Sequence, residues 1–132
     1  MMRKLFLLLV FILFGAGAEI MAQQPNQSLG ANGGCTIFTP NAFTPNGDGK
    51  NDLFKLTVPE NCEVIKFSMQ IFDRWGRRVF TTDDVFESWD GTFDGQILEE
   101  GVYLWYYTAT LRKVNDPEVN EQEKRGTAIL IR

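Results

Sequence analysis

The residues best suited to chemistry lie in the segment Asn46-Gly47-Asp48-Gly49-Lys50-Asn51-Asp52. Its oxygen-bearing side chains are separated by glycines, which permit tight backbone turns. Because calcium prefers oxygen ligands, the segment is a candidate calcium site formed by Asn46, Asp48, Asn51 and Asp52. It is not an EF-hand, since the bidentate Glu at loop position twelve has no equivalent here. In the alternative interpretation, the Asn and Asp side chains accept hydrogen bonds from nearby backbone amides and form consecutive turns.

Residue types that carry catalysis are scarce in this chain. It contains no histidine, which removes the commonest general base and the usual zinc and Ser-His-Asp arrangements. The carboxylates that could pair as acid and base are Asp48, Asp52, Asp90 and Asp94. They stand close to turn glycines, where acidic residues are more often structural. We therefore expect a protein that acts by binding and is not an enzyme.

Aromatic side chains offer a second kind of site. A platform for stacking sugars could be formed by Trp75, Trp89, Trp105, Tyr103, Tyr106 and Tyr107. In a domain this small, large aromatics supply much of the core burial, so we expect most of them in the core. Trp75 is the one expected to be exposed, because it lies in a turn with Arg74, Arg77 and Arg78. These arginines are alternatively solvated turn charges that pair with nearby aspartates and contribute little each.

Residues 1–22 have the three-part layout of a secretory signal peptide. Arg3 and Lys4 precede an apolar run over residues 5–14, and small residues follow it. This run is too short for a membrane-spanning helix, which needs roughly 20 apolar residues. We expect cleavage after Ala22, with Ala18 as the alternative, and no stable transmembrane anchor. Residues 23–34 are rich in Gln, Asn and Gly and are expected to form a flexible leader.

The composition fits an exported, packed domain. The 132 residues are 44% hydrophobic and 23% charged, which is ordinary for one globular domain. A formal net charge of −4 argues against nucleic acid as a partner. Cys35 and Cys62 enter an oxidising compartment with the exported chain, so we expect one disulfide between them. Such a bridge would stabilise the fold by roughly 3 to 4 kcal/mol; the alternative is two free, buried thiols.

The chain after Cys35 alternates short apolar runs with turn signals, and no stretch has helical apolar spacing long enough for a core helix. Strands are expected over residues 36–39, 54–58, 64–73, 78–82, 102–111 and 127–131. Apolar residues occupy both faces of 102–111, as a central strand requires. The polar residues 112–125 are expected to form a solvated loop. About seven strands in roughly 100 residues predict an all-β, immunoglobulin-like antiparallel β-sandwich over residues 35–132.

Three motifs occur in a characteristic order. They are Pro40-Asn41-Ala42-Phe43-Thr44-Pro45-Asn46-Gly47-Asp48-Gly49-Lys50-Asn51-Asp52, then Ile71-Phe72-Asp73-Arg74-Trp75-Gly76 with Val79-Phe80, then Trp89-Asp90-Gly91 leading to Gly101-Val102-Tyr103. With the closing residues 126–132, they resemble the gliding motility-associated C-terminal domain, a type B sorting domain of the type IX secretion system. The resemblance covers about residues 35–132.

The resemblance implies a path and a set of partners. The chain would cross the inner membrane by its signal peptide, fold in the periplasm, and be recognised as a folded unit by the outer-membrane translocon and outer-membrane docking proteins. It would then be secreted or remain associated with the cell surface. Such domains normally follow a large adhesin or enzyme. With only a short leader expected before Cys35, we expect the domain itself to be the exported component or a fragment of a longer product.

A recognition surface is expected at the positive and aromatic turn formed by Arg74, Trp75, Arg77 and Arg78. Arg132 is a second candidate, because it ends the chain with a charged side chain and a free carboxylate. A frayed end is the alternative for Arg132. The alternative function is a small secreted carbohydrate-binding module with a surface polysaccharide as its partner.

Overall fold

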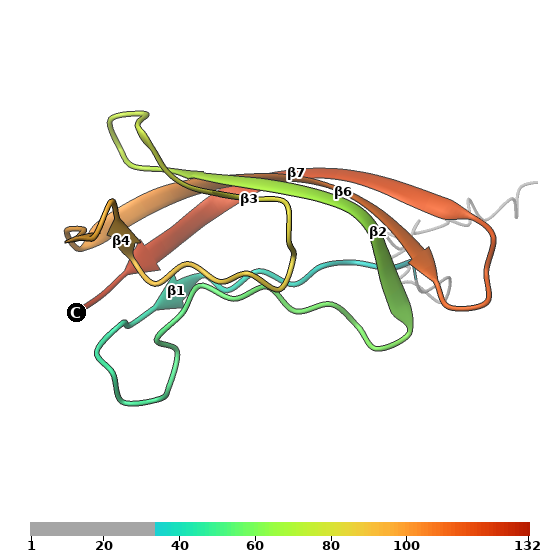
Figure 1. The fold of residues 1–132 in the computed structure, drawn as a ribbon, viewed down its shortest axis with the longest axis horizontal. Coiled ribbons are helices and arrows are strands. Elements are labelled where there is room, and N and C mark those ends of the chain that lie inside the picture. Colours follow the sequence, from blue (N-terminus) through green and yellow to red (C-terminus); the bar gives the residue numbers. More distant parts are fainter. Residues whose placement is uncertain (1–33) are drawn as a thin grey trace, which may run out of the picture. The chain divides into compact units, whose positions relative to one another are not determined.

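The computed structural model describes residues 34–132, which form strands and turns with no helix among them (Figure 1). The seven strands are β1 (Ala42–Phe43), β2 (Cys62–Phe72), β3 (Arg78–Thr82), β4 (Thr92–Phe93), β5 (Gln96–Ile97), β6 (Gly101–Lys113) and β7 (Val119–Leu130). The predicted all-β fold is confirmed. The expected signal peptide and residues 23–33 of the expected leader lie outside the described residues.

Five of the strands form one sheet in the order β1-β7-β6-β2-β3, and β4 pairs with β5 in a small hairpin. Within the large sheet, neighbours are antiparallel except for β1, which runs parallel to β7. The β6-β7 ladder runs in one continuous register from Gly101 opposite Leu130 to Arg112 opposite Val119. β6 is therefore central in the sheet, as its apolar content predicts.

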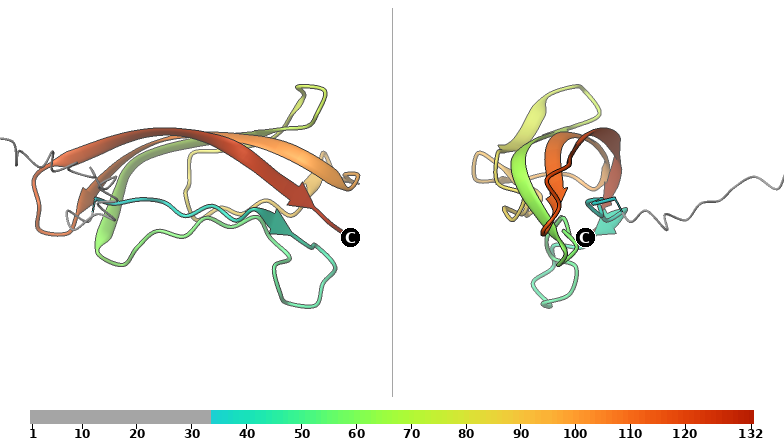
Figure 2. Two further views of the ribbon diagram at one scale, coloured as in Figure 1. Left: turned by 180° about the vertical axis from the view of Figure 1, so that it is seen from behind. Right: turned by 90° about the vertical axis from the view of Figure 1, so that its right-hand side faces the viewer.

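The second layer of the sandwich is built from extended segments rather than from a continuous sheet. Figures 1 and 2 show the segments around residues 35–60 and 83–91 running below the large sheet. Two isolated bridges, Phe38 with Thr57 and Phe54 with Trp89, connect these segments. The strands expected over 36–39 and 54–58 are thus reduced to single bridged pairs. The layers are consistent with a β-sandwich, whereas the immunoglobulin-like topology stays a prediction.

The prediction of a solvated loop over residues 112–125 is wrong. β6 continues to Lys113, and β7 begins at Val119, so only residues 114–118 turn the chain. β1 covers the outer edge of β7 only beside Ile129 and Leu130. Over the rest of its length β7 is held by its ladder with β6, and its side chains are mostly exposed. A strand that is exposed at a sheet edge can be polar on both faces. The polar composition of residues 112–125 therefore fits a strand as well as the predicted loop.

The core lies between the large sheet and the facing segments. Alternate residues of β6 point inward and are buried, namely Tyr103, Trp105, Tyr107, Ala109 and Leu111. From the opposite layer, Trp89 packs with its ring centroid 5.0 Å from that of Tyr103 and 5.3 Å from that of Phe43. The predicted core role is confirmed for Trp89, Trp105, Tyr103 and Tyr107, which leaves no sugar-stacking platform among these four side chains.

The predicted disulfide between Cys35 and Cys62 is confirmed, with a Cα–Cα distance of 5.6 Å. It joins the start of the described chain to the start of β2, across a separation of 27 residues. Cys35 is buried among the core residues, so the bridge fixes the first segment of the second layer onto the large sheet.

Loss of this bridge should destabilise the domain. We expect Cys35→Ser to lower the free energy of unfolding by about 3.5 kcal/mol, because a loop of this length is released in the unfolded chain. Urea unfolding followed by tryptophan fluorescence measures the change. As a control, the free energy of unfolding of the variant with both cysteines replaced by Ser should not change when reductant is added. Equal stability of the wild type with and without reductant would contradict the prediction.

Candidate recognition site

The β2-β3 hairpin turns through the three residues Arg74, Trp75 and Gly76. Asp73 closes the turn, since its N–H donates to the Arg77 carbonyl at 2.9 Å and its carbonyl accepts the Gly76 N–H at 3.0 Å. Gly76 has a φ of 80°, the left-handed conformation that a three-residue hairpin loop requires at its third position. The local sequence therefore specifies the turn that presents the predicted surface.

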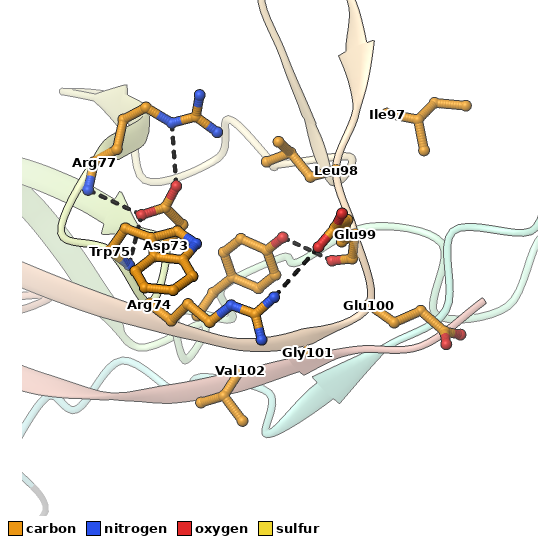
Figure 3. Close-up of a pocket in the computed structure, with 11 residues that line it drawn as sticks. Asp73, Arg74, Trp75, Arg77, Ile97, Leu98, Glu99, Glu100, Gly101 and Val102 are labelled. Atoms are coloured by element: carbon orange, nitrogen blue, oxygen red, sulfur yellow. Dashed lines mark hydrogen bonds and ion pairs between the residues drawn. The ribbon is translucent and has the colours of Figure 1, made fainter.

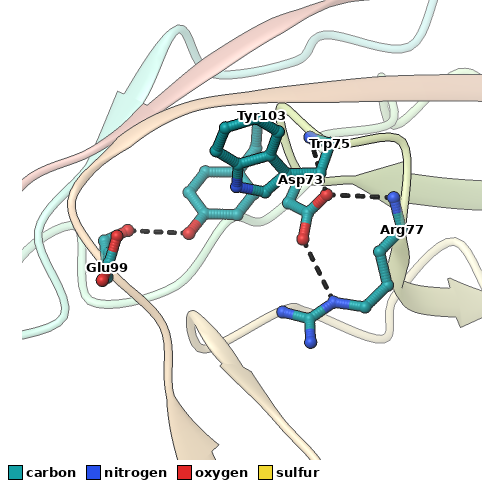
Figure 4. A network of polar contacts seen from close by, with 5 residues as sticks. All are labelled: Asp73, Trp75, Arg77, Glu99 and Tyr103. Atoms are coloured by element: carbon teal, nitrogen blue, oxygen red, sulfur yellow. Dashed lines mark hydrogen bonds and ion pairs between the residues drawn. The ribbon is translucent and has the colours of Figure 1, made fainter.

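The Asp73 carboxylate makes this turn rigid (Figure 4). One oxygen accepts the main-chain N–H groups of Trp75 and Arg77, both at 2.9 Å, and the other accepts Arg77 Nε at 3.1 Å. Burial acts to raise the pKa of Asp73, but these donors and the charge of Arg77 outweigh it and hold the pKa below its ordinary value of 3.8. The carboxylate is therefore ionised at neutral pH, the form that accepts all three bonds.

Arg74 and Trp75 are presented to solvent at the tip of the turn. Trp75 is 82% exposed, and the Arg74 guanidinium lies 5.4 Å from the centre of its ring. The same guanidinium is 3.3 Å from the Glu99 carboxylate. Ion pairs between exposed groups such as these contribute little stability, so Arg74 can exchange Glu99 for a carboxylate of a partner at small cost.

The other two arginines of the predicted surface differ from Arg74. Arg77 is bound to Asp73, and its guanidinium lies 5.2 Å from the ring centre of Phe93 in β4. Its role is therefore to join the turn to the β4-β5 hairpin. Arg78 is exposed at the start of β3, where it pairs with Phe72. The structure thus brings Arg74, Trp75 and Arg77 together and places Arg78 on the adjoining strand.

A pocket of about 260 Å³ lies between the turn and residues 97–103 (Figure 3). The Tyr103 hydroxyl donates to the Glu99 carbonyl at 2.7 Å. Burial, followed by the negative charges of Asp73 and Glu99, raises the pKa of Tyr103 above its ordinary value of 10.0, so the hydroxyl remains a donor. With charges of both signs and an exposed indole beside it, the pocket is suited to binding a side chain of another protein.

Arg132 is bonded to the same segment, at Leu98 and Glu100. Its guanidinium donates to three main-chain carbonyl oxygens, those of Leu98 and Gly91 at 3.2 Å and that of Pro45 at 3.4 Å. Its main-chain N–H donates to the Glu100 carboxylate. These bonds hold Arg132 in place, against the frayed alternative, and join the loop at Pro45 to the two ends of the β4-β5 hairpin. No sequence pattern predicts this role of Arg132, because the three carbonyls meet only in the folded domain.

The Trp89-Asp90-Gly91 motif builds the surface on which Arg132 rests. The buried Trp89 indole donates to the Thr92 carbonyl at 2.9 Å, and the Asp90 carboxylate accepts the Thr92 N–H at 3.0 Å. Gly91 has a φ of 79°, and a Cβ there would stand 2.8 Å from the Leu130 side chain. Only glycine therefore permits this close approach, which presents the Gly91 carbonyl to Arg132.

Replacement of Arg132 should loosen this end of the domain. We expect Arg132→Ala to lower the free energy of unfolding by about 1 to 2 kcal/mol, since three carbonyls lose a charged donor. Arg78→Ala, which changes an exposed arginine on β3, should stay within about 0.5 kcal/mol of wild type. Thermal and urea unfolding of the two variants measure the difference; equal stabilities would show that Arg132 does not tie the loops together.

The segment Asn46–Asp52 forms turns around the Asp52 carboxylate. Its oxygens accept the main-chain N–H groups of Asn46, Gly47 and Gly49 at 3.0, 2.8 and 2.7 Å. The Asp48 side chain accepts the Lys50 N–H at 2.8 Å. In residues 34–132 no group of three or more His, Cys, Asp or Glu side chains is placed to hold a metal ion. The geometry favours the turn alternative, and calcium binding stays a prediction, testable by melting with and without chelator.

Acid should weaken this loop. The hydrogen bond from Gly47, with those from Gly49 and Asn46, outweighs desolvation and holds the pKa of Asp52 below its ordinary value of 3.8. A depressed folded pKa gives stabilisation that is complete above pH 3.8 and is lost as pH falls through the folded value. We therefore expect Asp52→Asn to lose less stability than wild type between about pH 5 and about pH 2 in urea unfolding. Parallel pH profiles would contradict this.

The fold and the site define a small, disulfide-linked β domain that presents a rigid basic and aromatic turn. Residues 37–128 match the model of the CHU_C type IX secretion signal domain family. Because the match spans more than half of the 132 residues, the chain belongs to this family. No curated protein matches the chain.

Family membership gives the domain its role. It is a sorting module of the type IX secretion system, which is exported and then secreted or associated with the cell surface, and it interacts with the type IX secretion machinery. The alternative of a carbohydrate-binding module is not supported. Within residues 34–132 there is no helix long and apolar enough to span a membrane.

Proposed function

We propose that the outer-membrane translocon and its docking proteins recognise residues 35–132 as a folded, non-catalytic unit. In this proposal, residues 1–22 direct the chain into the periplasm and are removed, and residues 23–34 act as a flexible leader. The domain then folds, forms its disulfide and meets the machinery. The recognition surface is centred on Arg74 and Trp75.

The observation that carries this proposal is the exposed indole on a rigid turn. An 82% exposed tryptophan gains no stability from burial in its own fold, yet the Asp73 carboxylate holds its backbone in one conformation. Tryptophan and arginine are the residues most enriched among interface hot spots. A turn that is already ordered also avoids the entropy that a flexible loop loses on binding. These properties support a contact made by the folded domain.

A reporter fusion tests the proposal. Residues 23–132 are fused behind a periplasmic reporter in a host with an active type IX system, and the exported fraction is measured. We expect export of the wild-type fusion and a loss of about tenfold or more with Trp75→Ala, which truncates an interface hot spot. Phe86→Ala serves as the matched control, since Phe86 is also an exposed aromatic, at 69%. A wild-type fusion that stays in the periplasm would refute sorting; equal export of both variants would refute the role of the turn.

A further inference from the structure

The outward face of the large sheet carries an apolar patch that the described residues leave uncovered. In antiparallel ladders, directly paired residues point to the same face. Val102 pairs with Ile129, and Leu104 pairs with Phe72, so these four residues, here called the outer patch, share the face opposite the core. Val102, Leu104 and Ile129 are 51%, 49% and 44% exposed.

The outer patch explains an oddity of the central strand. Apolar residues on both faces of β6 predict a strand covered on both sides. The structure confirms the central position but covers only the inner face, where Tyr103, Trp105 and Tyr107 are buried. Contiguous exposed aliphatic side chains of this kind mark interaction surfaces more often than isolated ones do.

Charge is distributed unevenly over the same face. Arg78 pairs with Phe72 at one side of the outer patch, and Arg125 pairs with Tyr106 one row further along the sheet. At the opposite end of the face, Glu123 pairs with Thr108 and Glu121 with Thr110. The apolar residues are therefore bordered by Arg78 and Arg125. The carboxylates nearest Val102, those of Glu99 and Glu100, are already bonded to Arg74 and to the Arg132 N–H.

The turn of the candidate site adjoins the outer patch. Figures 1 and 2 show the β2-β3 turn projecting on the side of the sheet away from the facing segments. Val102 belongs to both features, because it also lines the pocket together with Arg74 and Trp75. A single partner surface can therefore contact the turn and the outer patch at once.

We propose that the outer patch is the docking face for a type IX secretion component whose contact surface is apolar at its centre and acidic at its rim. This inference rests on the proposed function and extends it from the turn to the sheet. Protein interfaces combine an apolar centre with a polar rim in which charges are complementary. A second copy fits less well, since patch-to-patch association would bring the arginines of both copies around one apolar centre.

Export of the full 132-residue chain, detected with an antibody, tests this inference in a host with an active type IX system. We expect Leu104→Glu to lower the exported fraction about tenfold or more, and Arg125→Glu to lower it about threefold or more. Two controls on the same face but at its polar end, Thr110→Glu and Glu121→Arg, should be exported within about twofold of wild type. Leu104→Thr, which retains high strand propensity, replaces Leu104→Glu if melting of the purified variant shows a folding defect.

The outcomes separate the two proposals. Export of wild type together with equal export of the patch variants would overturn the docking face and leave sorting intact. Retention of wild type in the periplasm would overturn sorting and the docking face with it. A wild-type dimer in gel filtration that Leu104→Glu converts to a monomer, with export unchanged, would assign the outer patch to a second copy and also overturn the inference.

Discussion

The structure depends on one aromatic cluster that holds its two layers together. Phe43 comes from the first motif of the sequence and Trp89 and Tyr103 from the third, and the Trp89 ring centroid lies 5.3 Å from that of Phe43 and 5.0 Å from that of Tyr103. Large aromatic side chains dominate the burial energy of a small core. Since most of the second layer has little strand pairing of its own, this packing and the disulfide are what keep its extended segments against the large sheet.

The same cluster accounts for the placement of the proposed recognition surface. Trp89 introduces the turn that offers the Gly91 carbonyl to Arg132, and Tyr103 bonds to Glu99 beneath the pocket. The segment between β5 and β6 is thus held by Arg132 at Leu98 and by Tyr103 at Glu99. A core that fixes this segment also fixes the environment of Trp75, so the proposed recognition of the turn would require complete folding.

Several elements follow directly from sequence patterns. The alternation within residues 64–73 reflects one buried face, and Gly76 after Trp75 marks the hairpin loop that leads to the return strand at 78–82. The disulfide follows from two cysteines in an exported chain. Other features could not be predicted, because they depend on tertiary position. The polar strand β7 lies at a sheet edge, where its ladder rather than its hydrophobicity holds it, and the bonds of Arg132 join loops brought together only by folding.

The outward face of β6 is more apolar than its exposure explains. Its apolar residues predicted a covered strand, and the structure leaves Val102 and Leu104 about half exposed. In a domain whose family serves secretion, a covering partner resolves this difference better than a defect in packing does. The domain thus has a fully packed core, and one apolar face of its large sheet is exposed for the proposed partner.

Site-specific cross-linking in cells tests this central claim most directly. A photoreactive amino acid replaces Trp75, Leu104 or Thr110 in the exported chain, and cross-linked proteins are identified by mass spectrometry. We expect Trp75 and Leu104 to capture the same component of the type IX machinery, whereas Thr110 on the polar end of the face does not. Capture of that component from Thr110 alone, or equally from all three positions, would contradict it.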